Sequence, residues 1–63
     1  MAPLVQEPLL TAQDVARLAG TTRSTVYGWA ERGVIPHLRL GGLIRFDPAA
    51  VMDWIEQGRQ VAR

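Results

Sequence analysis

The spacing of the apolar residues changes twice along this chain, and this change constrains the fold more than any other feature. Up to Arg32 the large apolar residues recur at every third or fourth position, which is the spacing of one face of a helix. Between Val34 and Phe46 they alternate on both sides of a Gly-Gly pair, which is typical of a β-hairpin. The helical spacing returns after Asp47. The pattern predicts helix, helix, two-stranded hairpin and helix, in a mainly α-helical domain.

The first predicted helix spans residues 11–19. Thr11 is a good N-cap, and Asp14 falls at the third helical position, where a carboxylate faces free backbone amides and the positive helix end. Gly20 suits the left-handed residue that ends a helix. The expected buried stripe consists of Val15, Leu18 and Ala19.

A second helix is predicted over residues 22–32. Thr21 or Thr22 caps its start, and Gly33 follows its end. Its expected buried stripe consists of Val26, Trp29 and Ala30. Two short helices joined by a turn of about three residues that contains a glycine fit the helix-turn-helix motif.

The hairpin has two candidate registers, which differ in the length of the loop at its tip. A two-residue loop, Gly41-Gly42, pairs Leu40 with Leu43. A three-residue loop pairs Leu40 with Ile44 instead. Because a shift of one residue moves every side chain of a strand to the opposite face, the two registers bury different residues.

We expect the three-residue loop, because burial favours it. It places Arg39 opposite Arg45 on the exposed face, whereas the two-residue loop puts Arg45 on the core face. Like charges directly opposite each other repel, so an exposed arginine pair predicts a bound anion. The large apolar residues that this register buries are Leu38, Leu40, Ile44 and Phe46.

The last predicted helix begins at Asp47-Pro48, with Asp47 as its cap and Pro48 at its first position. Its expected buried stripe consists of Val51, Trp54 and Ile55, and Gly58 ends it. Because both tryptophans fall on apolar stripes, Trp29 and Trp54 are expected in the core. The chain then divides into a flexible arm over residues 1–8, a folded domain over residues 9–58 and a frayed tail over residues 59–63.

Composition excludes several classes of protein. The chain has 63 residues with no cysteine and one histidine, so neither disulfides nor a thiolate zinc site can brace it. No apolar run reaches the roughly 18 residues that cross a bilayer, and no segment resembles a signal peptide. A chain this short has little room for a lined pocket. We therefore expect no enzyme activity, no cofactor, no metal and no membrane partner, in a cytoplasmic protein.

Positive charge is concentrated in the middle of the chain. Between Arg17 and Arg45 there are five arginines and one acid, a net charge of +4, whereas the rest has two arginines and five acids, a net charge of −3. The whole chain carries only +1 at pH 7. A basic middle between acidic flanks predicts one face made for an anion, although a chance bias among solvated residues gives the same count.

Several short motifs follow one another in a fixed order over roughly residues 9–58. They run L-T-x-x-E-V-A-x-x-L, S/T-x-x-T-V-x-x-W, G-x-I/L-P and R-x-G-x-x-x-R-F, with an aromatic residue in the closing helix. The matching residues are Leu10, Thr11, Val15, Ala16, Leu18, Thr22, Thr25, Val26, Trp29, Gly33, Ile35, Pro36, Arg39, Gly41, Arg45, Phe46 and Trp54. In these motifs the chain resembles the winged-helix DNA-binding domains of phage excisionases and MerR-like proteins.

The resemblance implies a winged helix-turn-helix that binds duplex DNA, with the second helix in the major groove and the hairpin, or wing, along the backbone or minor groove. Elementary chemistry agrees, because a recognition helix presents its N-terminal residues to base edges and arginine can fork onto guanine. Thr22 and Ser24 also fit simple capping, Tyr27 fits a shield over the core edge, and the glycines fit a plain turn. The predicted DNA-binding residues are Thr22, Arg23, Ser24, Thr25, Tyr27, Arg39, Gly41, Gly42 and Arg45.

One position departs from the family pattern. Family members often carry a basic residue just before the tryptophan of the second helix, where this chain has Gly28. A glycine inside a helix costs roughly 1 kcal/mol relative to alanine. Two explanations stay open: the helix backbone approaches DNA closely at Gly28, or the second helix contributes less affinity than usual.

Three functions remain open. The first is an excisionase, which bends attachment-site DNA and assists an integrase in excision. Such a protein would be associated with the nucleoid of a bacterial host. The second is a small transcriptional regulator that binds a promoter. The third, from a different class, is a protein-interaction adaptor that uses exposed Leu43, Met52 and Val61.

We favour the excisionase. The sequence ends at Arg63, so we expect neither the long dimerisation helix nor the effector domain of MerR-type regulators. No heptad pattern follows the last helix, so we expect a monomer in solution that loads cooperatively beside other copies on DNA. The candidate contacts between copies are Leu43, the arm at Leu4 and Val5, and the tail at Val61.

Overall fold

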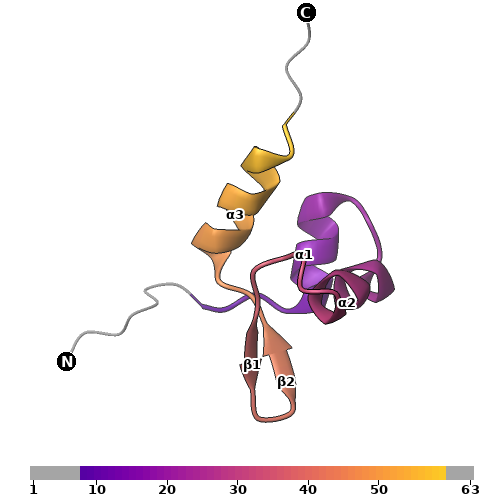
Figure 1. Ribbon diagram of the computed structural model, residues 1–63, viewed down its shortest axis with the longest axis vertical. Coiled ribbons are helices and arrows are strands. Elements are labelled where there is room, and N and C mark those ends of the chain that lie inside the picture. The colour runs from indigo at the N-terminus through magenta and orange to yellow at the C-terminus, as the bar shows by residue number, and fades with distance from the viewer. Residues whose placement is uncertain (1–7, 60–63) are drawn as a thin grey trace, which may run out of the picture.

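The computed structural model describes residues 8–59, and its elements follow the predicted order (Figure 1). The helices are α1 (Ala12–Ala19), α2 (Arg23–Glu31) and α3 (Pro48–Gln57), and the strands are β1 (Leu38–Leu40) and β2 (Leu43–Arg45). Three helices and a two-stranded antiparallel hairpin make a winged helix-turn-helix, as the sequence predicts. Residues 1–7 and 60–63, with the candidate contacts Leu4, Val5 and Val61, lie outside the described residues.

Helix α1 begins with the predicted capping box. The Asp14 amide donates to Thr11 Oγ1 at 3.2 Å, and the Thr11 amide donates to Asp14 Oδ2 at 3.0 Å. The backbone amide and side chain of Thr11 beside the Asp14 carboxylate hold its pKa below the ordinary value for aspartate, and the charge of Arg17 adds to the effect. The helix ends at Gly20, which has the left-handed φ of 72° that the sequence predicts.

The buried face of α1 differs from the predicted stripe. Its buried residues are Ala12, Val15 and Ala16, whereas Leu18 is 51% exposed and Ala19 is also exposed. The buried residues lie in the first five positions of α1 and belong to the central cluster, while the last turn extends past it. Helical spacing defines a face but does not say how far along the helix the neighbouring elements reach.

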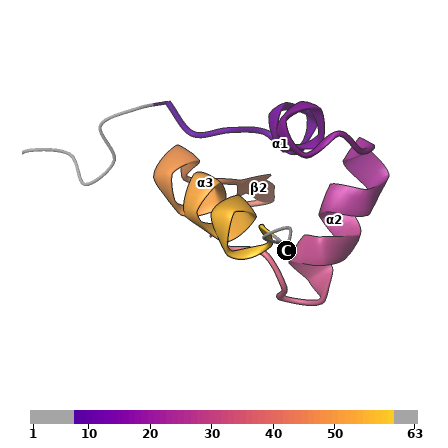
Figure 2. The ribbon, with the colours of Figure 1, turned by 90° about the horizontal axis from the view of Figure 1, so that it is seen from above.

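Helix α2 follows α1 after a tight turn. The Thr21 amide donates to the Ala16 carbonyl at 2.9 Å, and Thr22 then caps the new helix. Val26 and Ala30 are buried as predicted. Figure 2 shows α1 nearly end-on while α2 runs lengthwise, so the two helices cross steeply. This crossing is the geometry of a helix-turn-helix.

The hairpin has the two-residue loop, so the predicted register is wrong. Gly41 has φ of +61°, and a glycine of positive φ at the first of two loop positions fits a type II′ turn. Directly paired residues share a face, so Arg39 and Arg45 lie on opposite faces of the hairpin instead of facing each other. The cross-strand pairs are Leu38 with Arg45, Arg39 with Ile44, and Leu40 with Leu43.

The predicted register fails because burial does not govern most of this hairpin. The hairpin projects from the body of the domain, beyond the three helices (Figure 1). Leu40 is 47% exposed and Leu43 is 54% exposed, while Ile44 is half-buried. Because little of the core covers the hairpin, its register follows the geometry of its two-residue turn.

A short backbone pairing closes the domain. Leu10 and Phe46 form an isolated antiparallel bridge, which the apolar spacing does not predict. The Leu10 amide donates to the Phe46 carbonyl at 2.7 Å, and the Phe46 amide donates to the Leu10 carbonyl at 2.9 Å. The Phe46 side chain is 0% exposed, so the chain before α1 and the chain after the wing meet over the core.

The core is small and wholly apolar. Within residues 8–59, no polar or charged residue is buried. The buried residues come from all three helices, from the segment after α2 and from the end of the wing. They are Ala12, Val15, Ala16, Val26, Ala30, Ile35, Phe46 and Val51.

Helix α3 begins where the sequence predicts, with Pro48 at its start. Asp47 has the extended backbone of an N-cap, but its side chain makes no capping hydrogen bond. The prediction that Trp29 and Trp54 lie inside the core is wrong, because both are half-buried at its edge. Their ring centroids lie 5.2 Å apart with the planes tilted by 58°, so the two indoles contact each other and join α2 to α3.

We predict that Phe46→Ala unfolds the domain and that Trp54→Ala only weakens it. Removing a buried phenylalanine costs about 3–5 kcal/mol, which is comparable to the whole stability of so small a core. Trp54 is partly exposed, so its removal costs less. Circular dichroism with urea titration of both variants measures the difference. A Trp54→Ala variant as unfolded as Phe46→Ala would contradict the placement of Trp54 at the core edge.

Candidate nucleic-acid interface

The start of α2 is held by two threonines. The Thr25 amide donates to Thr22 Oγ1 at 3.3 Å, and the two hydroxyl oxygens lie 3.1 Å apart. Thr22 therefore has the capping role that the sequence left open for it. Ser24 is exposed, and its side chain makes no hydrogen bond to another residue between 8 and 59. Its hydroxyl is available to a ligand.

The other polar residues of this half of α2 also face solvent. Arg23 is the first helical residue and is exposed. Tyr27, one turn further on, is 42% exposed and is not among the apolar residues packed against the core. Arg23, Ser24 and Tyr27 thus offer a guanidinium, a hydroxyl and a phenol to a partner at the N-terminal half of the helix. This is the half of a recognition helix that reaches base edges.

Gly28 lies beside an arginine that the sequence reasoning missed. A Cβ at Gly28 would lie 3.5 Å from Arg32 Nη1, so the Arg32 guanidinium lies next to the empty position. Arg32 is the C-cap of α2 and is exposed. Its charge lies where family members often carry a basic side chain. The signal that could have found it is the spacing of four residues, which places two positions on one helix face.

The wing presents its arginines on two faces. Arg39 is exposed on the face that carries Ile44. Arg45 is half-buried on the other face, and its Nη1 donates to the Ile44 carbonyl at 2.9 Å. A Cβ added at Gly41 or Gly42 would meet nothing within 4 Å, so the tip is narrow and open. The wing therefore carries positive charge on both sides of a slender tip.

Ion pairing leaves α2 and the wing positively charged. Between residues 8 and 59, Arg17 pairs with Asp14 at 2.7 Å and Arg59 pairs with Glu56 at 2.7 Å. In the same part of the chain, no ion pair includes the arginines of α2, its C-cap or the wing. These arginines are Arg23, Arg32, Arg39 and Arg45. The basic residue of α1 and the one that follows α3 are thus paired with acids, whereas the arginines of the predicted interface are not.

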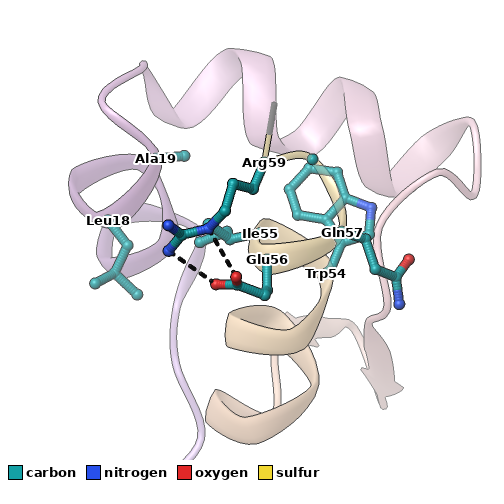
Figure 3. Close-up of a pocket in the computed structure, with 8 residues that line it drawn as sticks. Leu18, Ala19, Trp54, Ile55, Glu56, Gln57 and Arg59 are labelled. Atoms are coloured by element: carbon teal, nitrogen blue, oxygen red, sulfur yellow. Dashed lines mark hydrogen bonds and ion pairs between the residues drawn. The ribbon is translucent and has the colours of Figure 1, made fainter. Parts of the chain in front are cut away.

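A hollow of about 650 Å³ lies between the ends of α1 and α3. Figure 3 shows Leu18 and Ala19 on one side and Trp54, Ile55 and the Arg59–Glu56 pair on the other. It explains the exposure of Leu18, because α3 does not close over the last turn of α1. Its lining is apolar apart from Gln57 and the ion pair, and it includes none of the predicted DNA-binding residues.

The described part of the chain has neither a metal-ligand cluster nor a membrane-spanning helix. No group of three or more His, Cys, Asp or Glu side chains in residues 8–59 is placed to hold a metal ion. None of the three helices is long and apolar enough to cross a membrane. His37, which the sequence places beside the wing, is half-buried, and its Nδ1 lies 2.9 Å from the Ile35 carbonyl.

Residues 9–59 match the family model described as a helix-turn-helix domain. The match covers most of the chain, and the chain belongs to this family. It is a DNA-binding family that includes excisionase-like proteins and is typically non-enzymatic. No curated protein and no solved structure matches the chain.

We predict that Gly28→Ala stabilises the domain. The added Cβ would make an ordinary contact with Arg32 Nη1, and Gly28 has no positive φ, so alanine fits without strain. The expected gain is about 0.5–1 kcal/mol, which thermal unfolding measures as a rise of a few degrees.

The same variant separates the two explanations of Gly28. We expect unchanged DNA affinity, because the Arg32 guanidinium already lies over this position. A clear loss of affinity in a gel-shift titration of a stabilised Gly28→Ala protein would show instead that the bare helix backbone approaches DNA. The reverse exchange in the same helix, Ala30→Gly, cannot serve as a control, because Ala30 is buried and its loss would also change the core.

Proposed function

We propose that this protein binds specific sites on duplex DNA, with α2 in the major groove and the wing against the minor groove. The observation that carries the proposal is the distribution of unpaired charge, since the arginines of α2 and the wing have no acidic partner in residues 8–59. One unpaired basic cluster on α2 and another on the wing suit the two grooves that a winged helix contacts. Membership of a DNA-binding family supports the same proposal.

Within this interface the residues have different roles. Arg23 and Ser24 lead the recognition helix and contact base edges, because side chains at this end reach furthest into the groove. Thr22 and Thr25 chiefly fix the helix start. Arg39 and Arg45 contact phosphates, which position the protein but carry no sequence information.

We further propose that the protein acts as an excisionase, which bends attachment-site DNA and assists an integrase. A single small module buries only roughly 600–1,000 Å² against DNA, which is too little for tight specific binding alone. Neighbouring copies supply the remaining affinity. Phosphate neutralisation and wing contacts then offset the cost of bending, which runs to a few kcal/mol. Of the three candidate contacts between copies, Leu43 lies within the described residues and is exposed.

We predict that duplex binding weakens steeply with salt. With about four to six phosphate contacts, log K falls with log salt at a slope of about −0.9 per contact. Gel-shift titration over a range of salt concentrations measures the slope. A flat response would contradict binding through the arginines.

We predict different effects for arginines of the helix and of the wing. Arg23→Ala reduces discrimination between specific and random duplexes, because it removes a base contact. Arg39→Ala and Arg45→Ala weaken binding to both duplexes alike and lower the salt slope by about one contact each. The matched control is Arg59→Ala, which removes the same charge just after the end of α3, where Arg59 is paired with Glu56. Wing variants that lose only specific binding would contradict this division.

The excisionase proposal is tested by recombination. A plasmid with paired attachment sites and its integrase is assayed for excision with and without the protein. We expect excision to depend on the wild-type protein and to fall with Arg23→Ala but not with Arg59→Ala. Specific duplex binding without any effect on excision would instead favour a transcriptional regulator at a promoter.

A further inference from the structure

The wing carries a row of leucines that the fold does not use. In the observed register, Leu38, Leu40 and Leu43 lie on one face of the hairpin. All three are exposed, and none belongs to the core or to the apolar residues packed against it. A chain with so small a core gains nothing for folding from large apolar side chains left in solvent. Exposed apolar residues grouped on one face mark a contact surface.

We propose that the tip of the wing is an apolar wedge, in which Leu40 and Leu43 insert between base pairs from the minor groove. This inference rests on the proposed binding of duplex DNA and adds how the protein bends it. Proteins that kink DNA from the minor groove do so with apolar side chains of this kind, which partly unstack a base step.

The shape of the tip suits such an insertion. Leu40 and Leu43 are directly paired across the hairpin and immediately flank the loop. The loop itself consists of Gly41 and Gly42, which have no side chains and have open space around them. The glycines let the tip enter a groove only about 6 Å wide, and the leucine pair follows directly behind them.

The charges around the leucines select DNA over an apolar protein surface. Arg45 shares the leucine face, directly opposite Leu38, and Arg39 projects from the other face. A protein surface that covered the leucines would desolvate the Arg45 guanidinium. A minor groove instead offers base edges to the leucines and a phosphate strand on each side to the two arginines. The leucine face of the wing, flanked by two arginines, therefore complements a groove with base edges between two phosphate strands.

The test begins with a duplex site selected by the wild-type protein from random duplexes. The bend at a single site is measured by energy transfer between dyes at the duplex ends. Unstacking is measured by placing a fluorescent aminopurine at successive positions. We expect the wild-type protein to bend the duplex and to raise the fluorescence at one step.

The decisive variant is Leu40→Ala/Leu43→Ala. Both side chains are about half exposed, so the variant keeps the fold, which circular dichroism checks. We expect it to bind the single site while losing most of the bend and the fluorescence gain. The matched control is Met52→Ala, an exposed apolar residue of α3 outside the wing. This control should bend DNA as the wild type does.

Other outcomes overturn the wedge. A double variant that bends a single site normally but loses cooperative loading on longer DNA would make the leucines a contact between copies. If the double variant does not bind DNA, the aminopurine scan with the wild-type protein becomes the deciding measurement. Insertion is rejected if the wild-type protein raises the fluorescence at no position. A wild-type protein that binds without bending also rejects the wedge and leaves DNA binding intact. Failure of the wild-type protein to bind any duplex would reject the proposed function itself.

Discussion

The fold depends on the antiparallel pairing of Leu10 with Phe46. Two backbone hydrogen bonds of 2.7 and 2.9 Å join the segment before α1 to the end of the wing, and the Phe46 side chain is buried in the core. Thr11 follows Leu10 and caps α1, while Pro48 lies two residues after Phe46 and begins α3. One contact thus fixes where the helix-turn-helix begins, where the wing ends and where the closing helix starts.

The core formed by the buried apolar residues between positions 8 and 59 leaves most of the wing outside it. The hairpin is therefore held at its base, through Ile44 and Phe46, and its tip is shaped by its own turn. This arrangement frees both faces of the tip for contact with a partner. The small size of the core also explains the last turn of α1. Leu18 borders an open hollow there, because α3 does not extend over it.

The charges follow a similar division. Arg17 on α1 and Arg59, just after the end of α3, each form an ion pair with an acidic residue three positions earlier in the chain. The arginines of α2 and the wing have no ion-pair partner in residues 8–59, so their positive charge is available to a bound partner. Arg32 extends this surface along α2, because its guanidinium lies beside Gly28. A small protein can in this way present a basic interface while its net charge is only +1.

Local chemistry in the sequence was enough to determine the order of the elements and their starts. Thr11 with Asp14, Thr22 and Pro48 each act through residues within one turn, so their positions are predictable from spacing alone. Tertiary structure decided how far each apolar face is covered. The exposure of Leu18 and the half-burial of the tryptophans depend on where other elements end, which a periodic pattern does not encode. The hairpin register follows the Gly41-Gly42 turn, because the core leaves the tip uncovered. The placement of Arg39 and Arg45 on opposite faces follows from that register, and so does the paired position of Leu40 and Leu43, because a shift of one residue reverses the face of every side chain in a strand.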